Sequence, residues 1–423
     1  MNMSSSLLWH LGKSYIAVVV LLGFLLPSAP AATKLTLDQA VALAEAYHPL
    51  LRAGMAQIDA AQAGLTTARA YPNPTASAIA GAQTIRVPGN VNGYSQFFTA
   101  TQPLELGSLR PTRLQLAQRN RESYEIRLAG TRIGVLSSVR RAFFLVLRRR
   151  AEIEILQESL RLVEQLRNRI QVRVEVGEAG RLELIRADSE LVTARSAANA
   201  AQLQYISALA QFRTTVGSTL DADIEVDGKL DETVALPPLN SLREQALNQH
   251  PAMAFVRAEI KRLEANVSYE VAQRRPQPQV LAEIERPPDS PSYRFGVSIP
   301  INLWNRREGP IAEAVAQVRV AAALARNREL EFVSALEAAY ARYNLANQQL
   351  SAFEQGLLLA ANEAVRAAEV AYRLGERGIL EVLDSQRVLR TVRLDFLTTQ
   401  YDRQSALVDL DELRAVDLRR NIP

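Results

Sequence analysis

Two carboxylates close to residue 380 are the side chains best suited to chemistry with a charged solute. Glu381 and Asp384 are three positions apart and follow Gly378, so both lie on one face if the segment is helical. Acidic residues also stabilise the first turn of a helix through its dipole, which is the alternative explanation. That alternative fits Glu381, whereas Asp384 lies deeper in the helix. We therefore expect this pair to attract cations.

The rest of the sequence has few residue patterns that would indicate a metal site or a catalytic site. His48 and His250 each precede a proline, and they are either metal ligands or residues that interrupt two helices. No cluster of cysteine and histidine accompanies them, which favours the second interpretation. Because the chain has no cysteine, it has no disulfide, thiolate zinc site, cysteine nucleophile or lipid-modified cysteine. No catalytic constellation is evident, so we expect neither an enzyme nor a cofactor.

The composition of the 423 residues excludes several classes of protein. A charged fraction of 22% and a mean hydropathy of -0.06 are unlike those of a polytopic helical membrane protein. A hydrophobic fraction of 48% argues against disorder. The net charge of +4 comes without a long basic tract, and the run of three arginines at 148–150 is more typical of a solvated helix face or of pairing between helices than of a basic binding patch. We expect no nucleic-acid partner.

Residues 1–31 have the features of a secretory signal. Lys13 precedes an apolar stretch at 16–26, and Ala29 and Ala31 form a small-residue cleavage pattern. An N-terminal membrane anchor is the alternative, but the apolar stretch is shorter than the roughly 20 residues of a spanning helix. We therefore expect an exported protein.

An internal duplication runs through the whole chain. Motifs of the first half return about 200 residues later. The pairs are His48-Pro49 and His250-Pro251, Pro72 and Pro276, Pro103 and Pro300, Gly177 and Gly375, and Gly180 and Gly378. Each half is predicted to contain, in order, a helix, two strands, a long helix, a turn and a return helix.

The first repeat is expected at residues 32–217. Its strands are predicted at about 73–106, its long helix at about 108–176 and its return helix at 181–217. The segment 218–240 is acidic, carries two adjacent prolines and is expected to be a linker or a small equatorial segment.

The second repeat is expected at residues 241–415, before a C-terminal tail at 416–423. Its strands are predicted at about 277–304, its long helix at about 305–374 and its return helix at 379–415. Proline-free runs of 125 and 112 residues support the two long helices. Apolar residues spaced by three and four along both return helices predict closely packed coiled coils, and Gly130 and Gly134 predict a local unwinding of the first long helix.

The strands are short and amphipathic. From 293 to 303, apolar residues occupy every odd position. Their aromatic residues form either a girdle at a membrane interface, which we favour, or the core of a soluble sandwich. The girdle residues are Tyr94, Phe98, Tyr293, Phe295 and Trp304. Four strands cannot close a membrane barrel, which needs at least about eight, but three chains together would supply twelve.

These motifs resemble those of the TolC-like outer-membrane efflux factors. The resemblance spans about 35–415 and includes Ala-Tyr-Pro-Asn-Pro at 70–74, Gln-Pro-Leu-Glu-Leu-Gly at 102–107 and the two Gly-x-x-Gly turns. The strand regions are most similar to the CzcC-like branch, which serves heavy-metal cation pumps. The resemblance implies a mainly α fold with a small β part: a trimeric α-barrel of coiled coils capped by a 12-stranded outer-membrane β-barrel, with four strands from each chain.

The resemblance also implies function and partners. The expected role is a passive channel in the outer membrane of a Gram-negative bacterium, with most of its mass in the periplasm. It would form a homotrimer in contact with outer-membrane lipid, a periplasmic membrane-fusion adaptor and an inner-membrane proton-driven pump of the resistance-nodulation-division type. A channel for drug efflux or type I secretion, and a periplasmic coiled-coil adaptor without a pore, are the alternatives.

Related channels close their periplasmic end with polar links between hairpins and carry an acidic ring there. Matching those motifs implies a latch in which Tyr372 and Arg377 bond to Glu183. It also implies a gate ring of Glu381 and Asp384. The turns expected to face the adaptor contain Gly177, Gly180, Gly375 and Gly378.

Overall fold

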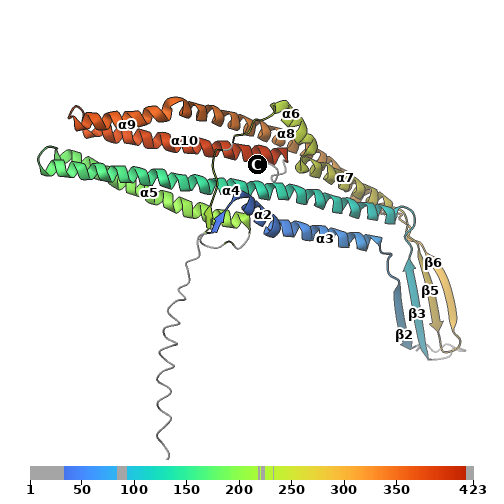
Figure 1. Ribbon diagram of the computed structural model, residues 1–423. Helices are drawn as coiled ribbons and strands as arrows, with labels where there is room; N and C mark the ends of the chain where they lie inside the picture. The colour runs from blue at the N-terminus through green and yellow to red at the C-terminus, as the bar shows by residue number, and fades with distance from the viewer. Residues whose placement is uncertain (1–32, 83–92, 218–219, 221–223, 232, 416–423) are drawn as a thin grey trace, which may run out of the picture.

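The computed structural model describes residues 33–82, 93–217, 220, 224–231 and 233–415. Long helices lie side by side along the molecule, and a four-stranded sheet extends from one end of them (Figure 1). The predicted signal segment and C-terminal tail lie outside the described residues, as does part of the predicted linker. None of the described helices is both long and apolar enough to cross a membrane.

The first repeat contains two short helices, two strands and a long helical hairpin. Its elements are α2 (Leu37–Tyr47), α3 (Pro49–Arg69), β2 (Thr75–Ala82), β3 (Tyr94–Pro103), α4 (Leu109–Glu175) and α5 (Arg181–Val216). The local unwinding predicted at Gly130 and Gly134 is wrong, because α4 continues through both glycines. Glycine costs a helix only about 1 kcal/mol, and the packing of so long a helix outweighs that cost.

The second repeat follows the same order. Its elements are α6 (Leu239–Gln249), α7 (Pro251–Ala272), β5 (Gln279–Arg286), β6 (Ser292–Ser298), α8 (Glu308–Ala352), the π-helical segment η1 (Phe353–Leu357), α9 (Leu358–Arg373) and α10 (Ile379–Arg414). The duplicated, mainly helical fold with a small β part is therefore confirmed. One difference from prediction is that the second long helix is interrupted at η1.

The two His-Pro steps separate α2 from α3 and α6 from α7. His48 and His250 each cap the helix that follows, with Nδ1 accepting a hydrogen bond from the backbone N–H of Leu50 and of Ala252, at 3.2 and 3.0 Å. Proline at the next position suits a first helical turn, whose N–H groups have no partner within the helix. Both histidines thus act as helix caps.

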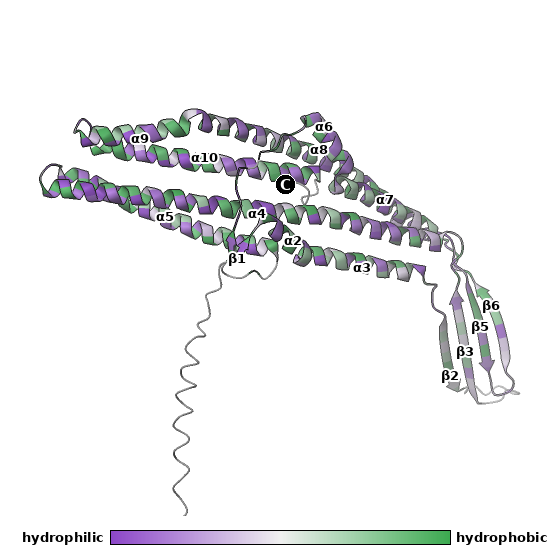
Figure 2. Cartoon of the chain, in the orientation of Figure 1, coloured by the Kyte–Doolittle hydropathy of each residue, from purple (hydrophilic) through white to green (hydrophobic). Residues whose placement is uncertain are grey.

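The main sheet is antiparallel, with the order β2-β3-β5-β6. Its register puts Phe98, Ile284 and Tyr293 in one row of one face. That face is mostly apolar, whereas Glu283, Glu285 and Arg294 lie on the other, where the arginine forms ion pairs with both glutamates. Figure 2 shows hydrophilic and hydrophobic residues alternating along β5 and β6. Each strand therefore has one face suited to an apolar environment and one suited to water.

Sequence patterns did not predict a second, smaller sheet at the middle of the helices. Strands β1 (Thr33–Leu35) and β4 (Ile224–Val226) pair in parallel there. They cover one apolar cluster around Phe143 of α4 and Phe212 of α5. A second cluster joins α8 to α10, with Leu336 and Leu407 fully buried. These two clusters hold the body of the molecule together.

Candidate functional site

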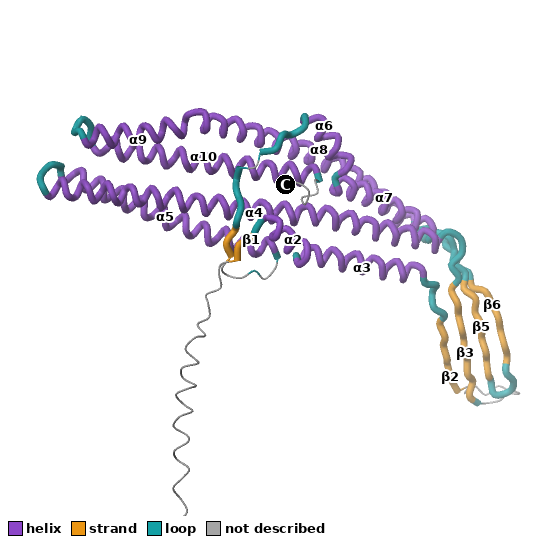
Figure 3. Tube along the Cα trace, in the orientation of Figure 1, coloured by secondary structure: helices purple, strands orange, loops and turns teal. Residues whose placement is uncertain are grey.

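The two hairpin turns lie at the end of the molecule farthest from the sheet (Figure 3). They share one backbone conformation: Gly177 has φ 78° and Gly375 has φ 76°, in the left-handed region that favours glycine. Equivalent hydrogen bonds close both turns, from the N–H of Glu178 to the carbonyl of Arg173 and from Glu376 to Ala371, at 2.8 and 3.0 Å. This geometry requires the first glycine of each Gly-x-x-Gly motif.

The second glycine of each motif begins the return helix. Gly180 and Gly378 have extended backbones and occupy the N-cap positions of α5 and α10. Neither has a side chain to cap the helix, so no side-chain cap bonds the N–H groups of either first turn. The two tips therefore present similar backbone surfaces.

Tyr372 and Glu183, two of the three predicted latch residues, meet between the tips. The Tyr372 hydroxyl donates a hydrogen bond to Glu183 Oε2 at 3.1 Å, linking α9 to α5. Burial raises the pKa of Tyr372, and the bond to Glu183 raises it further, so the phenol stays a proton donor. The third residue, Arg377, is exposed, and within the described chain no hydrogen bond or ion pair joins it to Glu183.

Arg173 is a latch neighbour that the sequence did not reveal. Its guanidinium lies over the Tyr372 ring, 4.9 Å from the ring centroid, and pairs with Glu178 at 3.8 Å. A cation over an aromatic face stabilises the ring where it sits. Arg173 is one of many arginines on α4, and only its position four residues before Gly177 distinguishes it.

Apolar side chains hold the tips together beneath the latch. Ile170 of α4 and Ala187 of α5 pack against Ile379, Val382 and Leu383 of α10, and all five are buried. The first hairpin and the second hairpin therefore share one small core at their tips.

A buried carboxylate links the hairpins two helical turns farther from the tip. Glu190 of α5 is only 3% exposed and accepts hydrogen bonds from Arg387 Nε at 2.9 Å and Arg390 Nη1 at 3.4 Å. The bond to Glu190 is the main reason that the pKa of Arg387 is raised. Sequence analysis missed Glu190; the available signal was an acidic residue beside Leu191 on the apolar seam of α5.

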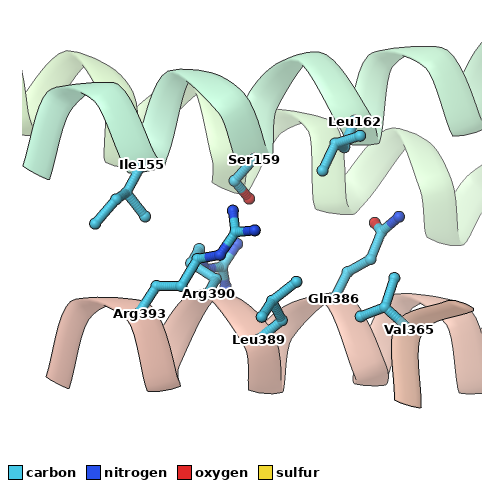
Figure 4. A pocket seen from close by; sticks show the side chains of 8 residues that line it. All are labelled: Ile155, Ser159, Leu162, Val365, Gln386, Leu389, Arg390 and Arg393. Atoms are coloured by element: carbon cyan, nitrogen blue, oxygen red, sulfur yellow. The ribbon is translucent and has the colours of Figure 1, made fainter. Parts of the chain in front are cut away.

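Beyond Glu190 the hairpins meet around a small cavity. Figure 4 shows Arg390 and Arg393 of α10 pointing toward α4, with Ser159 opposite, around a cavity of about 30 Å³. Arg393 also pairs with Glu158 of α4 at 2.9 Å. Apolar side chains from both hairpins also line this cavity, among them Leu162 of α4 and Leu389 of α10, and Leu394 of α10 packs against the cluster around Leu156 of α4, so the contact here is mixed.

The two predicted gate carboxylates, Glu381 and Asp384, are both exposed at the start of α10. In the part of the chain that the structure describes, no hydrogen bond or ion pair joins either side chain to another. After Glu190, Asp384 also contributes to the raised pKa of Arg387. Both carboxylates therefore remain accessible to a cation.

The predicted girdle residues are all exposed. Tyr94, Phe98, Tyr293 and Phe295 lie on the apolar face of the sheet, and Trp304, 94% exposed, lies between β6 and α8. Large exposed aromatic residues at several levels of a sheet are typical of a surface that meets lipid. Their role as a girdle stays a prediction.

The helical hairpins, the small amphipathic sheet and the paired tips define an outer-membrane efflux protein. The chain belongs to the outer membrane efflux protein family, whose model matches residues 40–218 and 242–415. The family predicted from the sequence is thus confirmed, and with it the outer-membrane location and a role other than catalysis.

Two curated relatives have metal-resistance names. The chain is 26% identical over 391 residues to the cobalt-zinc-cadmium resistance protein CzcC of Cupriavidus metallidurans, covering 90% of each chain. It is 26% identical over 295 residues to the nickel-cobalt-cadmium resistance protein NccC of Alcaligenes xylosoxydans xylosoxydans, covering 69% of this chain and 64% of NccC.

Solved structures show the same fold at low sequence identity. CusC superposes with a TM-score of 0.77 at 18% identity, over 89% of this chain and 91% of CusC. The CmeC outer membrane channel of Campylobacter jejuni superposes with a TM-score of 0.79 at 15% identity, over 89% and 85% of the two chains.

Proposed function

We propose that the protein is the outer-membrane channel of a tripartite efflux system and passively conducts heavy-metal cations to the exterior. The observation that carries this proposal is the similarity to CzcC, a cobalt-zinc-cadmium resistance protein, over 90% of both chains. The exposed carboxylates at the tip, Glu381 and Asp384, suit a cationic solute.

The channel is a homotrimer. In the described chain, β2 and β6 each pair on one side only, which leaves two open edges on the four-stranded sheet. An open edge is not tolerated in lipid, because its N–H and C=O groups find no water there. Joining β6 of one protomer to β2 of the next in three copies closes a 12-stranded barrel and removes every open edge.

The hairpins extend from the sheet toward the periplasm, and their tips narrow the entrance. Three copies bring six carboxylates, from Glu381 and Asp384, around one opening. The bonds from Tyr372 and Arg387 to the first hairpin favour a closed resting state. The glycine turns at the tips meet a periplasmic adaptor, which couples the channel to a proton-driven pump of the inner membrane.

Planar-bilayer recording of the purified, detergent-extracted protein tests this function. We expect a trimer that conducts cations in preference to anions and is blocked from the tip side by hexamminecobalt(III). A cell that lacks the gene should also lose resistance to cobalt, zinc or cadmium and regain it on complementation. A monomer without conductance contradicts the channel, and intact metal resistance with lost drug resistance assigns a different cargo.

A further inference from the structure

The connections between the helices and the main sheet are strongly basic. Four segments make these connections, at 69–74, 103–113, 270–279 and 299–308, and they gather at one end of the helices (Figure 3). We refer to the four segments as the junction. The junction contains seven arginines and three glutamates, with neither lysine nor aspartate. Its excess of positive charge equals the net charge of +4 of the entire chain.

The three glutamates of the junction have structural roles. The Glu105 side chain is only 7% exposed and accepts hydrogen bonds from Arg113. Glu270 of α7 pairs with Arg307 at 2.5 Å. Glu308 lies in the first turn of α8, where the helix dipole favours an acidic residue. Two of the seven arginines are therefore neutralised within the fold.

The other five arginines pair with no acidic side chain in the described part of the chain. One of them, Arg110, lies over the ring of Tyr71, 4.5 Å from the ring centroid. The remaining four are exposed to solvent: Arg69, Arg274, Arg275 and Arg306. A guanidinium binds a phosphate group through two parallel hydrogen bonds. The junction thus offers several phosphate-binding groups that no carboxylate occupies.

Hydrogen bonds tie the four segments of the junction to one another. They run from the Arg110 side chain to the carbonyl of Arg69, from the N–H of Leu106 to the side chain of Gln277, and from the side chain of Asn302 to the carbonyl of Arg274, at 2.9, 2.8 and 3.0 Å. Each bond joins one segment to the next along the chain. The exposed arginines therefore extend from a base whose segments are fixed to one another.

Exposed apolar side chains border these arginines. Beyond β6, where the apolar face of the sheet ends, Ile299, Ile301 and Leu303 are all exposed, and Trp304 is 94% exposed. Tyr71 precedes β2 and is 67% exposed. Tryptophan and tyrosine are enriched where hydrocarbon meets lipid headgroups, and a nearby arginine can extend its charge toward those headgroups. The junction therefore combines the two kinds of side chain that a membrane interface requires.

We propose that the junction binds the phosphate groups of anionic phospholipids in the membrane leaflet that faces the periplasm. The proposal rests on the channel proposed above, which puts the sheet in the outer membrane and the helices in the periplasm. At that depth Trp304 lies at the hydrocarbon boundary and the arginines lie at the level of the headgroups. A neighbouring protomer would bring an equally basic junction to the same level, so it does not supply the missing negative charge.

Trp304 provides a probe for this contact. The chain contains two tryptophans, so in the Trp9→Phe variant of the full-length chain Trp304 is the only one. Lipids brominated near the headgroup quench tryptophan fluorescence on contact. With the trimer in phosphatidylcholine vesicles, brominated phosphatidylglycerol should reach half-maximal quenching at a mole fraction at least about three-fold lower than brominated phosphatidylcholine does. Salt at about 1 M should remove most of this difference, because it screens charges beyond about 3 Å.

Equal quenching by the two lipids at low salt overturns the phosphate site. Quenching by neither lipid overturns the position of the sheet in the membrane as well. Normal bilayer conductance together with equal quenching removes the site and leaves the proposed channel standing. These comparisons use wild-type arginines, so they decide the question even if an arginine variant does not assemble.

Replacing the exposed arginines tests whether the junction makes the selection. In the variant with Arg69→Gln, Arg274→Gln, Arg275→Gln and Arg306→Gln, the two lipids should quench Trp304 alike. The matched control replaces four exposed arginines of the helices by glutamine and should keep the selection; they are Arg161, Arg243, Arg326 and Arg366. Selection that persists in the junction variant overturns the proposal. A junction variant that falls apart into monomers, beside a wild type without lipid selection, assigns the arginines to contacts between protomers instead.

Discussion

Arg387 of α10 donates a hydrogen bond from Nε to the carboxylate of Glu190 of α5, at 2.9 Å and across 197 positions of the chain. Glu190 is almost fully buried, whereas the Arg387 side chain is 48% exposed. The carboxylate was removed from water, and two arginines replace the hydrogen bonds that it lost. Glu190 therefore ties the second-repeat tip to the first hairpin more firmly than a surface pair would.

Glu190→Gln should loosen this tie while preserving side-chain size. Hydrogen bonds to charged groups contribute about 1.5–3 kcal/mol each, so we expect the free energy of unfolding to fall by about 1–3 kcal/mol. Single-channel conductance should rise because the tips separate more easily. Denaturant unfolding and bilayer recording measure the two effects.

The matched control is Glu164→Gln. Glu164 pairs with Arg195 at 3.0 Å, and both side chains are exposed, so this surface pair contributes only about 0–1 kcal/mol. Neither stability nor conductance should change appreciably. If Glu190→Gln changes the free energy of unfolding and the conductance no more than Glu164→Gln does, Glu190 does not hold the two hairpins together.

The predicted latch separates into a residue that acts within the chain and one that does not. Tyr372→Phe removes the hydroxyl that bonds Glu183 but leaves the ring beneath Arg173, so conductance should rise with little loss of stability. Arg377→Ala breaks no side-chain bond in the described part of the chain, so any effect on conductance would come through a neighbouring protomer of the proposed trimer. Recording both single variants and the double variant distinguishes these roles. Unchanged conductance in the double variant removes the latch.

Local patterns were enough to predict most of the fold. The repeated His-Pro steps, glycine turns and alternating strands are each set by a few neighbouring residues, and the structure shows a helix cap, a turn or a strand at each. The three-residue strands β1 and β4 went unpredicted, because segments so short carry no periodicity.

Features that depend on tertiary contacts were not predictable from the sequence. Glu190 is buried only because α10 supplies two arginines, which nothing in α5 indicates. Glycine content suggested a break in α4 at Gly130, whereas the break occurs at Gly356 in the other repeat. A glycine within a helix marks a possible weakness, and packing on both sides decides whether the helix is interrupted there.

His250 should make stability depend on pH. Its Nδ1 caps α7 and its Nε2 lies 2.9 Å from the carbonyl of Glu412, so the ring fits here as the neutral form, with Nε2–H as donor. Burial lowers the pKa of His250, against a smaller opposing effect of Glu412, whose carboxylate pairs with Arg141. The unfolded chain then binds a proton more readily, so stability falls as pH drops from about 6.5 toward the folded pKa.

His250→Asn should flatten that dependence. Asparagine also caps helices with its side-chain oxygen but does not titrate near neutral pH. His48→Asn is the comparison: His48 caps α3 in the same way and burial also lowers its pKa, but it is more exposed, so its replacement should change the pH dependence less. Denaturant unfolding at pH 7 and pH 5 measures the effect. If His250→Asn leaves the pH dependence of the free energy of unfolding unchanged, His250 is not its source.

Glu381 and Asp384 should set the response to multivalent cations. Both carboxylates are exposed beside the tips, and in the proposed trimer they would surround one narrow entrance. A ring of carboxylates in a confined mouth attracts cations and binds multivalent ones. Replacing both by alanine should abolish block by hexamminecobalt(III) and weaken cation selectivity. We expect trimer assembly to persist in this double variant.

Asp384→Ala alone separates this ring from the alternative explanation. Glu381 lies in the first turn of α10, where the helix dipole favours an acid whatever its function, and Glu183 of α5 holds the equivalent place. Asp384 lies beyond that turn, and its counterpart in the first repeat is Arg186. If Asp384→Ala loses the block by hexamminecobalt(III) while the free energy of unfolding changes by less than about 0.5 kcal/mol, the Asp384 carboxylate acts on cations in the pore and not on helix stability. If hexamminecobalt(III) still blocks the variant in which both Glu381 and Asp384 are alanine, the two acids only stabilise the start of the helix and do not form a ring at the entrance.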